Sequence, residues 1–440
     1  MSQILSNSKK TLARQVISIL IQIVSIIIIA RELGVEGNGQ YALAILLPTF
    51  MALFLSVGLT SSNIYFVGKK EFSLTTIYTT TISMGIIIVT IGLACGFLLV
   101  KLYGDTIFPN IPFEVLTIAL FIFPFSLMNA FQLSFLQAIE DFSTYNIVSL
   151  AQPIVFLFMI YSLYIFDVLT LKNIVLSSLI SPFLLLVVST FYVVQKGYAF
   201  KLSNYSGIYM KRSLSYGLRS HMSNLVAFVN YRADIFLLSL LATPVSVGLY
   251  YVAVQIVERL WILSQAMSAV LFPRFVALHE EDEKRVGLIA KAFRIVIILT
   301  LVASLLLSIF GYYAIGLLFG EDFLDAYFAI LFLIPGIVFS AGSRIVANAI
   351  AAKGKPELNI YTSVFAMVLN IILNILLIPQ YGFIGAAAAT SIAYTFNSIL
   401  RIWLFNRIEN EFHFNYLYLK KDDFHYIYIK IITIVNRRKK

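Results

Sequence analysis

The stretch "IPQYGFIGAAAATSIAYTFNSILR", residues 378–401, decides the fold class of this chain. From Gly382 it carries no charge until Arg401, and about 20 apolar residues are enough for an α-helix to cross the hydrocarbon of a bilayer. The run Gly385–Ala389 gives a soluble core almost no side chain to pack, whereas in a membrane small residues let helices approach closely. The stretch therefore predicts a membrane-spanning helix that packs tightly against a neighbour.

Helical spacing divides this predicted helix into two faces. The small residues share one of them: Gly382, Gly385, Ala389 and Ala393. A polar stripe lies roughly opposite: Thr390, Tyr394, Asn397 and Arg401. We expect the first face to pack against another helix, and we expect any functional contact on the second.

The composition of the whole chain extends this interpretation. It has 440 residues, of which 60% are hydrophobic and 12% charged, and its mean hydropathy is +0.89. A soluble domain carries roughly 25% charged residues, so lipid is the expected solvent. The sequence predicts an all-α polytopic membrane protein of about 12 transmembrane helices, at 11–31, 40–62, 75–100, 113–137, 145–166, 173–195, 214–241, 246–273, 292–312, 324–350, 358–378 and 383–405.

The net charge of +10 follows from topology. If the N-terminus is cytoplasmic, 24 of the 32 Lys and Arg residues lie on the cytoplasmic side, three lie on the other side and five lie within spans. This asymmetry is the positive-inside rule, with both termini cytoplasmic. Nucleic acid is not needed as a partner to explain the basic charge, and we expect the bilayer in its place.

The two halves of the chain repeat one another. A shift of 209 residues aligns "GNGQYALA" at 37–44 with "VSVGLYYVA" at 245–253, which places Gly39 on Gly248 and Tyr41 on Tyr250. Six spans in each copy give a parallel repeat, with a site expected between the copies near the membrane midplane. We therefore expect three parts: a six-helix bundle at 1–200, a second at 201–408, and a surface-associated or disordered cytoplasmic tail at 409–440.

Charged side chains inside the predicted spans are the strongest functional signal. Each costs roughly 2.5–3.5 kcal/mol at the bilayer centre, so such side chains face protein or water. Seven lie at least four residues from either end of a span, all within the second predicted bundle: Arg219, Arg232, Asp234, Glu258, Arg259, Arg344 and Arg401. Arg401 is close to a cytoplasmic end and is expected to reach the surface. The remaining charges are four arginines and two carboxylates, and this excess of positive charge favours an anionic ligand.

Helical phase separates the polar residues of the seventh predicted span. Arg219, Asn230 and Asp234 form one stripe, while His221 and Arg232 lie nearly opposite. We expect one set to line a cavity and the other to pair with a neighbouring helix. Hydrogen bonds between helices are the alternative role for each polar stripe.

Several functions are excluded by what the sequence lacks. It has no Gly-x(4)-Gly-Lys-[Ser/Thr] phosphate loop, and its four histidines have no metal-ligand spacing. No predicted loop outside the membrane is long enough for a transferase or polymerase domain. We therefore expect no cofactor and no enzymatic activity.

Four stretches carry a family resemblance that covers nearly the whole chain. They are "RQVISILIQIVSIIIIARELGVEGNGQYALA" (14–44), "NYRADIFLLSLLATPVSVGLYYVAVQI" (230–256), "LLFGEDFLDAYFAILFLIP" (317–335) and "NIILNILLIPQYGFIGAAAATSIA" (370–393). The chain resembles the polysaccharide-biosynthesis, O-antigen (Wzx-type) flippases of the multidrug/oligosaccharidyl-lipid/polysaccharide exporter superfamily.

The resemblance implies a MATE-like fold of two six-helix bundles around a cavity. It also implies that the chain moves an undecaprenyl-pyrophosphate-linked oligosaccharide, an O-antigen or capsule repeat unit, across the bacterial cytoplasmic membrane by alternating access. Polysaccharide polymerase and chain-length machinery are the implied protein partners.

The candidate site residues combine this resemblance with the buried charges. Arginine suits a pyrophosphate because its planar fork donates to two oxygens at once. The residues expected to bind pyrophosphate or glycan are Arg219, Arg232, Arg259, Arg344, Asn230, Asn348, Asn370 and Asn374. Those expected to couple transport to a proton or sodium gradient are Asp234, Glu258 and His221.

Two alternatives stay open. A multidrug/cation antiporter of the same superfamily typically uses an acidic residue in its N-terminal bundle. The first six predicted spans of this chain have no acidic residue except Glu114, which lies beside a loop at the start of the fourth. A membrane glycan ligase or polymerase is disfavoured by the short loops and by the parallel repeat.

Overall fold

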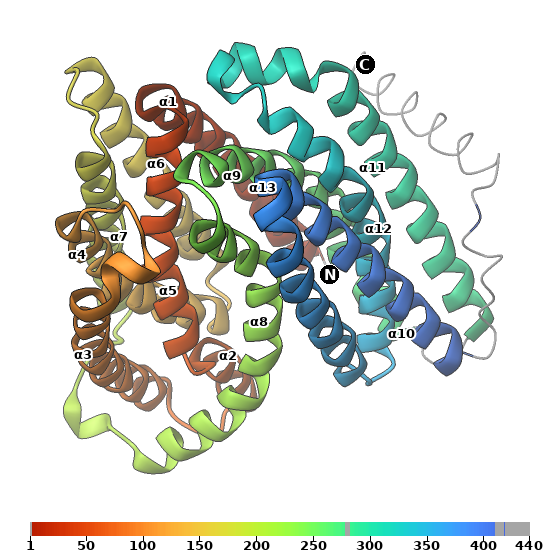
Figure 1. Ribbon diagram of the computed structural model, residues 1–440. Helices are drawn as coiled ribbons and strands as arrows, with labels where there is room; N and C mark the ends of the chain where they lie inside the picture. Colours follow the sequence, from red (N-terminus) through yellow and green to blue (C-terminus); the bar gives the residue numbers. More distant parts are fainter. Residues whose placement is uncertain (1, 278–281, 410–417, 419–440) are drawn as a thin grey trace, which may run out of the picture. The chain divides into compact units, whose positions relative to one another are not determined.

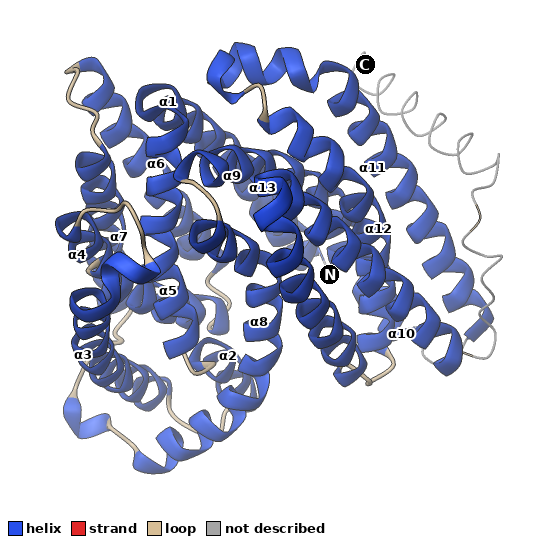
Figure 2. Ribbon diagram, in the orientation of Figure 1, coloured by secondary structure: helices blue, strands red, loops and turns tan. Residues whose placement is uncertain are grey.

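A computed structural model describes residues 2–277, 282–409 and 418 of the chain. Every regular element in these residues is a helix, and most helices are long (Figures 1 and 2). The predicted all-α class is therefore confirmed. All but Glu409 and Tyr418 of the predicted tail lie outside the described residues, so the expectation for the tail stays a prediction.

The helices form two compact units. Unit 1 comprises residues 1–228, 242–248 and 318–322, and unit 2 comprises residues 229–241, 249–317 and 323–440. The predicted division at residues 200 and 408 stays a prediction, as does the arrangement in two six-helix bundles.

Unit 1 contains seven complete α-helices and the first part of an eighth. Its elements are α1 (Ser2–Leu55), α2 (Leu59–Lys69), α3 (Leu74–Ile107), α4 (Phe113–Leu120), α5 (Ile122–Ala138), α6 (Phe142–Ile165), α7 (Leu171–Gln195), η1 (Leu202–Asn204) and the start of α8 (Gly207–Leu241). Within this unit α1 packs against α6, and α5 packs against α2 and α7.

Unit 2 begins within α8 and contains most of the later helices. Its elements are the end of α8, most of α9 (Pro244–Val257), η2 (Glu258–Trp261), α10 (Ile262–Ala277), most of α11 (Asp282–Phe319), α12 (Ala326–Ala352) and α13 (Glu357–Ile408); a short turn, η3 (Glu321–Phe323), lies at the boundary. Within unit 2, α12 packs along α13 and also contacts α10 (Figure 1).

Ten stretches of the described chain are long and apolar enough to cross a membrane. Two of these, Ala13–Lys69 and Glu357–Ile408, have 57 and 52 residues, more than twice the roughly 20 that one crossing needs. Each contains a glycine with positive φ and non-helical backbone, Gly34 (φ 65°) and Gly382 (φ 54°). Both breaks fall where the sequence predicts a connection between two spans. The chain is a multi-pass helical membrane protein, and the number twelve stays a prediction.

The small residues after Gly382 do pack against a neighbour. Gly385, Ala386, Ala387, Ala389 and Ala393 are all buried. On the opposing helix α12, Gly336 lies so close that an added Cβ would collide with the backbone of Ser391, and its N–H donates to the Ser391 hydroxyl at 2.9 Å. Ser391 lies opposite the small face in helical phase, and the small face makes its own close approach at Gly385, where an added Cβ would collide with the Leu377 carbonyl oxygen before the break. Thr390 and Tyr394 of the polar face are buried as well.

A second close approach joins the two repeat-related glycines. In unit 1, an added Cβ on Gly39 would collide with the carbonyl oxygen of Pro244, and one on Gly248 would collide with that of Val35. The positions that the sequence repeat aligns therefore lie against each other, α1 against the start of α9. Glycine is required because backbone contacts backbone at this point.

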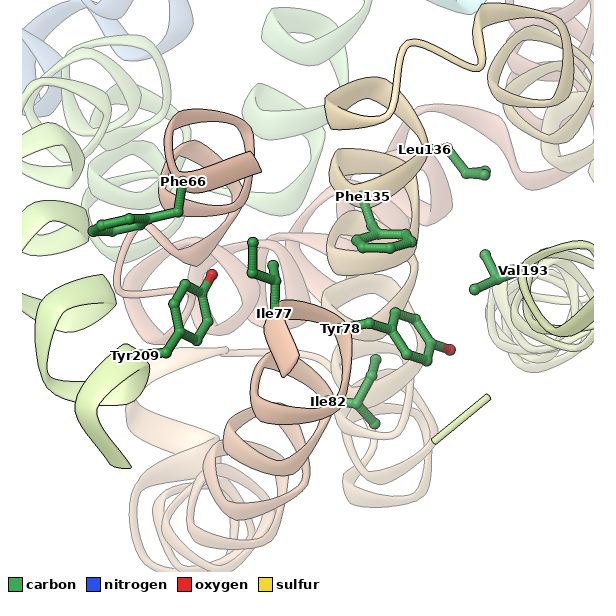
Figure 3. Close-up of a cluster of buried hydrophobic side chains, with 8 residues drawn as sticks. All are labelled: Phe66, Ile77, Tyr78, Ile82, Phe135, Leu136, Val193 and Tyr209. Atoms are coloured by element: carbon green, nitrogen blue, oxygen red, sulfur yellow. The ribbon is translucent and has the colours of Figure 1, made fainter. Parts of the chain in front are cut away.

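Aromatic and aliphatic side chains form a buried core in unit 1 (Figure 3). The core joins α2, α3, α5, α7 and the start of α8 through Phe66, Ile77, Tyr78, Ile82, Phe135, Leu136, Val193 and Tyr209. The two tyrosine hydroxyls have partners: Tyr209 donates to the Asn63 side chain at 3.0 Å, and Tyr78 accepts from Gln132 at 3.0 Å. This core fixes α5 and α7, which also line the polar cavity described below.

Candidate functional site

Arg232 and Glu258 form a two-bond ion pair in unit 2. The guanidinium on α8 donates to both carboxylate oxygens on η2, at 2.9 and 3.1 Å. The side chains are 28% and 18% exposed. Both charges are thus paired within the protein, which matches the expectation that one polar set of this helix bonds a neighbouring helix.

Arg344 lies on aromatic rings and contacts no carboxylate in the part of the chain that the structure describes. Its guanidinium carbon is 4.1 Å from the centroid of the Trp261 ring, and one nitrogen donates to the Tyr231 hydroxyl at 3.1 Å. The Trp261 indole donates in turn to Ser340 at 2.8 Å, so the ring under the cation is fixed. A cation on aromatic faces keeps its full charge available to an anion.

Arg401 points into unit 2, contrary to the expectation that it reaches the membrane surface. Its guanidinium donates to three hydroxyl groups, those of Ser343 (3.1 Å), Thr362 (3.4 Å) and Ser363 (3.3 Å), and its Nε has no partner. The hydroxyls of α12 and α13 replace water as acceptors, which removes the need to extend outward. No ion pair is found for Arg401 among the described residues.

Asp234 is the centre of a buried polar network. The carboxyl group is 1% exposed and accepts hydrogen bonds from the Tyr250 hydroxyl, from Thr390 at 3.2 Å and from the backbone N–H of Ile235 at 2.7 Å. Asn370 donates to Thr390 at 3.3 Å.

The network continues along α13. Asn374 donates to the Asn370 side-chain oxygen at 2.8 Å, while its own Oδ1 has no partner. Both amides are fully buried. The structure therefore brings the predicted coupling residue Asp234 together with two of the predicted binding residues, Asn370 and Asn374, in one cluster of oxygen atoms.

The other predicted site residues share no hydrogen bond with Arg344, with the Arg232–Glu258 pair or with the Asp234 network in the described part of the chain. Arg259 donates to Gln255 on its own helix segment at 3.0 Å. Two more predicted residues are buried with an unpartnered polar atom: His221 through Nε2 and Asn230 through Oδ1. Arg219, in unit 1, is exposed, and Asn348 is partly buried. Hydrogen bonds thus link Arg232 directly with Glu258, and they link Asp234 with the amides of α13 through Thr390. They do not join all of the predicted site residues in one network.

Three contributors escaped the sequence analysis. Tyr250 and Thr390 bond Asp234, and Trp261 supports Arg344. The repeat did single out Tyr250, as the partner of Tyr41, and helical phase put Thr390 on the polar face. No signal marked Trp261, since a tryptophan in an apolar segment is ordinary for a membrane helix.

Unit 1 holds a separate polar cavity of about 540 Å³. Arg14 is the one charged side chain among the described residues that line it, and most of the others carry hydroxyl or amide groups. The sequence analysis placed no site residue here, because it counted Arg14, close to the start of the first predicted span, among the cytoplasmic basic residues.

A protein-family model described as polysaccharide biosynthesis protein matches residues 28–328, which is more than half of the chain. The chain belongs to this family. The resemblance seen in the sequence is thereby confirmed.

Relatives of this polysaccharide biosynthesis protein include a putative O-antigen transporter of Shigella flexneri. The two are 26% identical over 424 residues, which cover 92% of this chain and 98% of that protein. A probable low-salt glycan biosynthesis flippase of Haloferax volcanii is 26% identical over 192 residues, and the match covers 43% of this chain and 41% of that protein. These relatives are named as a transporter and a flippase, which agrees with the prediction that the chain is not an enzyme.

Two solved structures show the same fold. The lipid II flippase MurJ in an inward closed conformation has a TM-score of 0.74 at 15% identity, covering 89% of this chain and 86% of that one. An inward-facing multidrug resistance MATE family transporter has a TM-score of 0.68 at 14% identity, covering 89% and 94%. The MATE-like fold implied by the sequence resemblance is confirmed by these likenesses.

Proposed function

We propose that this protein is a flippase for a lipid-linked oligosaccharide. The ligand is an undecaprenyl-pyrophosphate-linked repeat unit of O-antigen or capsule type, which moves from the cytoplasmic to the outer leaflet of the bacterial cytoplasmic membrane by alternating access. The observation that carries the proposal is Arg344, a cation held on two aromatic rings inside a membrane protein of the polysaccharide biosynthesis family, with no acidic partner in the described residues.

The physical need for such a protein is desolvation. An alcohol group that enters hydrocarbon without a hydrogen-bond partner costs roughly 4–8 kcal/mol, and an oligosaccharide has many. A pyrophosphate adds charge, for which the penalty is larger still. Polar side chains at membrane depth replace the lost water, while the polyprenyl chain stays in the lipid.

The arginines divide into two groups in this proposal. Arg344 and Arg401 bond only neutral groups in the described chain, so they keep their charge for the pyrophosphate. Arg219 and Arg259 stay candidates for the same role. Arg232, paired with Glu258, contributes to the ligand site mainly by holding α8 against η2.

Coupling to an ion gradient is assigned to Asp234 ahead of Glu258 and His221. The buried carboxyl of Asp234 contacts the hydroxyl oxygens of Tyr250 and Thr390, and Thr390 connects it to the amides of Asn370 and Asn374, an arrangement that suits a proton or a sodium ion. Sodium prefers such oxygen ligands, and a proton neutralises a buried carboxylate directly. Glu258 is already neutralised by Arg232.

The multidrug antiporter is the second candidate. A cationic drug would need an acidic group in the polar cavity of unit 1, and the described lining of that cavity offers Arg14 instead. A glycan ligase or polymerase has less support, because the described helices leave no large domain between them. The flippase is therefore favoured.

Location and partners follow from the same proposal. The excess of Lys and Arg on one side puts both termini in the cytoplasm. The substrate is made at the cytoplasmic face and consumed at the other, so the polysaccharide polymerase and chain-length machinery would act next on the flipped unit.

A reconstitution assay tests the function. Proteoliposomes with a labelled pyrophosphate-linked glycan in the inner leaflet are expected to expose it to an added glycan-modifying reagent. Arg344→Ala should abolish this exposure with little loss of folding, and Arg344→Lys should restore part of it, since lysine keeps the charge but not the fork. Normal transport by Arg344→Ala would contradict the assignment of this residue, and wild-type protein that moves a cationic drug but no glycan would favour the antiporter.

A gradient experiment tests the coupling. Transport by the wild type should rise when a sodium or a proton gradient is imposed, and the response identifies the ion. Asp234→Asn, which keeps the shape of the side chain but removes its charge, should lose that response. Transport that ignores both gradients would remove the coupling role of Asp234 and leave the flippase proposal intact.

A further inference from the structure

The polar cavity of unit 1 is built by four helices. Three lining side chains come from the first part of α1, five from the part of α1 after its break, and the rest from α5, α6 and α7. Its polar lining consists of Arg14, Ser18, Gln22, Tyr41, Thr49, Ser126, Ser149, Gln152, Ser178 and Ser181. The volume of about 540 Å³ lies within the roughly 300–1,000 Å³ that is usual for small-ligand pockets.

The cation in this cavity has no acidic counterpart. Arg14 lies with its guanidinium carbon 5.5 Å from the centroid of the Tyr145 ring, and its Nε is buried without a hydrogen-bond partner. No ion pair is formed by Arg14 within the described part of the chain. A guanidinium held in this way favours an oxyanion, to which it can donate two parallel hydrogen bonds.

The neutral side chains are only partly occupied with one another. Tyr41 and Ser178 are 3.4 Å apart through their hydroxyl oxygens, and Gln22 donates to Ser18 at 3.1 Å. The Ser149 hydroxyl is buried with no partner. Arg14 is therefore a cation without an acidic partner in a cavity whose other polar side chains are neutral.

The chemistry of the lining matches a sugar. Hydroxyl and amide groups both donate and accept hydrogen bonds, as sugar hydroxyls do, and a carboxylate-free surface does not repel a neighbouring anion. Polar residues that serve only to join helices would bond each other across the interface and would leave no cavity of this size. That difference separates a ligand site from ordinary helix packing.

We propose that this cavity is a glycan subsite that takes sugar rings of the transported oligosaccharide and holds an oxyanion of the same ligand against Arg14. The proposal rests on the proposed flippase function and adds a site inside unit 1 to the arginines of unit 2. The oxyanion is either a carboxylate on the sugar itself or the diphosphate that links the first sugar to the lipid.

The single cysteine of the chain allows a direct test. Cys95 on α3 is exposed, so Cys95→Ala provides a background without thiols. Ser126→Cys on α5 then puts a thiol in the lining of the cavity, at a partly buried side chain that makes no hydrogen bond within the described chain. Ser203→Cys, on the exposed turn η1, is the matched control outside the cavity.

The rate of modification by a small thiol reagent is measured on the purified full chain with four probes. These are a uronic-acid disaccharide, a neutral disaccharide, inorganic pyrophosphate, and the last two together. We expect severalfold slower modification of the Ser126→Cys variant with the uronic-acid disaccharide or with the combined probes, and no change in the control. The first result places the oxyanion on the sugar, and the second identifies it as the diphosphate.

Arg14→Ala in the same background should remove the part of the protection that depends on the anion, and thermal unfolding of each variant confirms that it is folded. Protection by pyrophosphate alone, or by none of the probes, would overturn the subsite. Translocation of the lipid-linked glycan by the Cys95→Ala protein is measured in parallel. Translocation without protection leaves the proposed function standing and removes only the subsite, whereas protection without translocation overturns the proposed function.

Discussion

The Arg232–Glu258 pair gives the sharpest test of which arginine is structural. Two charged hydrogen bonds of 2.9 and 3.1 Å join side chains that are 28% and 18% exposed. At an effective dielectric constant near 20, two unit charges about 4 Å apart attract by about 4 kcal/mol. Removing one partner of a buried pair typically costs about 3–5 kcal/mol, because the other charge is left without compensation.

We therefore expect Arg232→Ala to destabilise the protein by about 3 kcal/mol, the lower end of that range because neither side chain is fully buried. The double variant Arg232→Gln/Glu258→Gln should regain most of the loss, since it leaves no unpaired charge. Thermal unfolding in detergent measures both. Arg212→Ala is the matched control, because its bond of 3.1 Å to Glu71 joins side chains that are 58% and 35% exposed, and such surface pairs contribute about 0–1 kcal/mol.

The same variants separate stability from transport. If Arg232 acts only through the pair, the double variant should transport the glycan at a rate close to that of the wild type. An Arg232→Ala protein that unfolds at the wild-type temperature yet does not transport would refute the reasoning. It would show that the guanidinium binds substrate and that Glu258 only holds it in place.

Two further predictions concern packing and pH. Gly248→Ala should destabilise the protein by about 1–3 kcal/mol, seen as a lower unfolding temperature, because the added methyl group meets the Val35 carbonyl. Gly68→Ala has open space around it and should be neutral or stabilising, so equal behaviour of the two variants would argue against the close approach. Burial tends to raise the pKa of Asp141, but its hydrogen bonds to Lys196 and Thr144 and the Lys196 charge outweigh burial, so that the pKa stays below its usual range. The stability that this group contributes is then present above the usual carboxyl pKa of about 3.9 and is lost as the pH falls below it. The free energy of unfolding, followed from pH 6 to pH 3, should therefore decline less in Asp141→Asn than in the wild type. An identical decline would exclude the contribution.

The likeness to MurJ and to MATE transporters shows the fold of the chain and not the roles of its arginines. Fold alone does not choose between a lipid-linked glycan and a cationic drug, because function depends on the site. In this chain the choice depends on Arg344, Arg401 and Arg14, none of which has a carboxylate partner in the described residues. A cation exporter with the same fold would have little use for three such groups.

The sequence by itself determined the class of the protein and its helical course. Long uncharged runs require lipid, and in lipid the backbone must satisfy its own hydrogen bonds, so helices are the one solution that a linear apolar run can take. The stretch at 382–393 went further, because glycine and alanine at helical spacing specify a close contact, and the structure places the Leu377 carbonyl oxygen against Gly385. The sequence repeat likewise aligned Gly39 with Gly248, but the sequence did not predict that the two residues contact each other.

The tertiary structure alone decided which charges are paired. Helical phase separated Arg232 from Asp234 correctly, but it could not show that Glu258 lies opposite Arg232 or that Thr390 reaches Asp234 from a helix 156 residues later. Arg401 shows the limit clearly: its position near the end of a span favours the membrane surface, yet hydroxyls from α12 and α13 turn it inward. A charge in a membrane goes wherever it finds partners, and partners on distant helices are fixed only when the chain has folded.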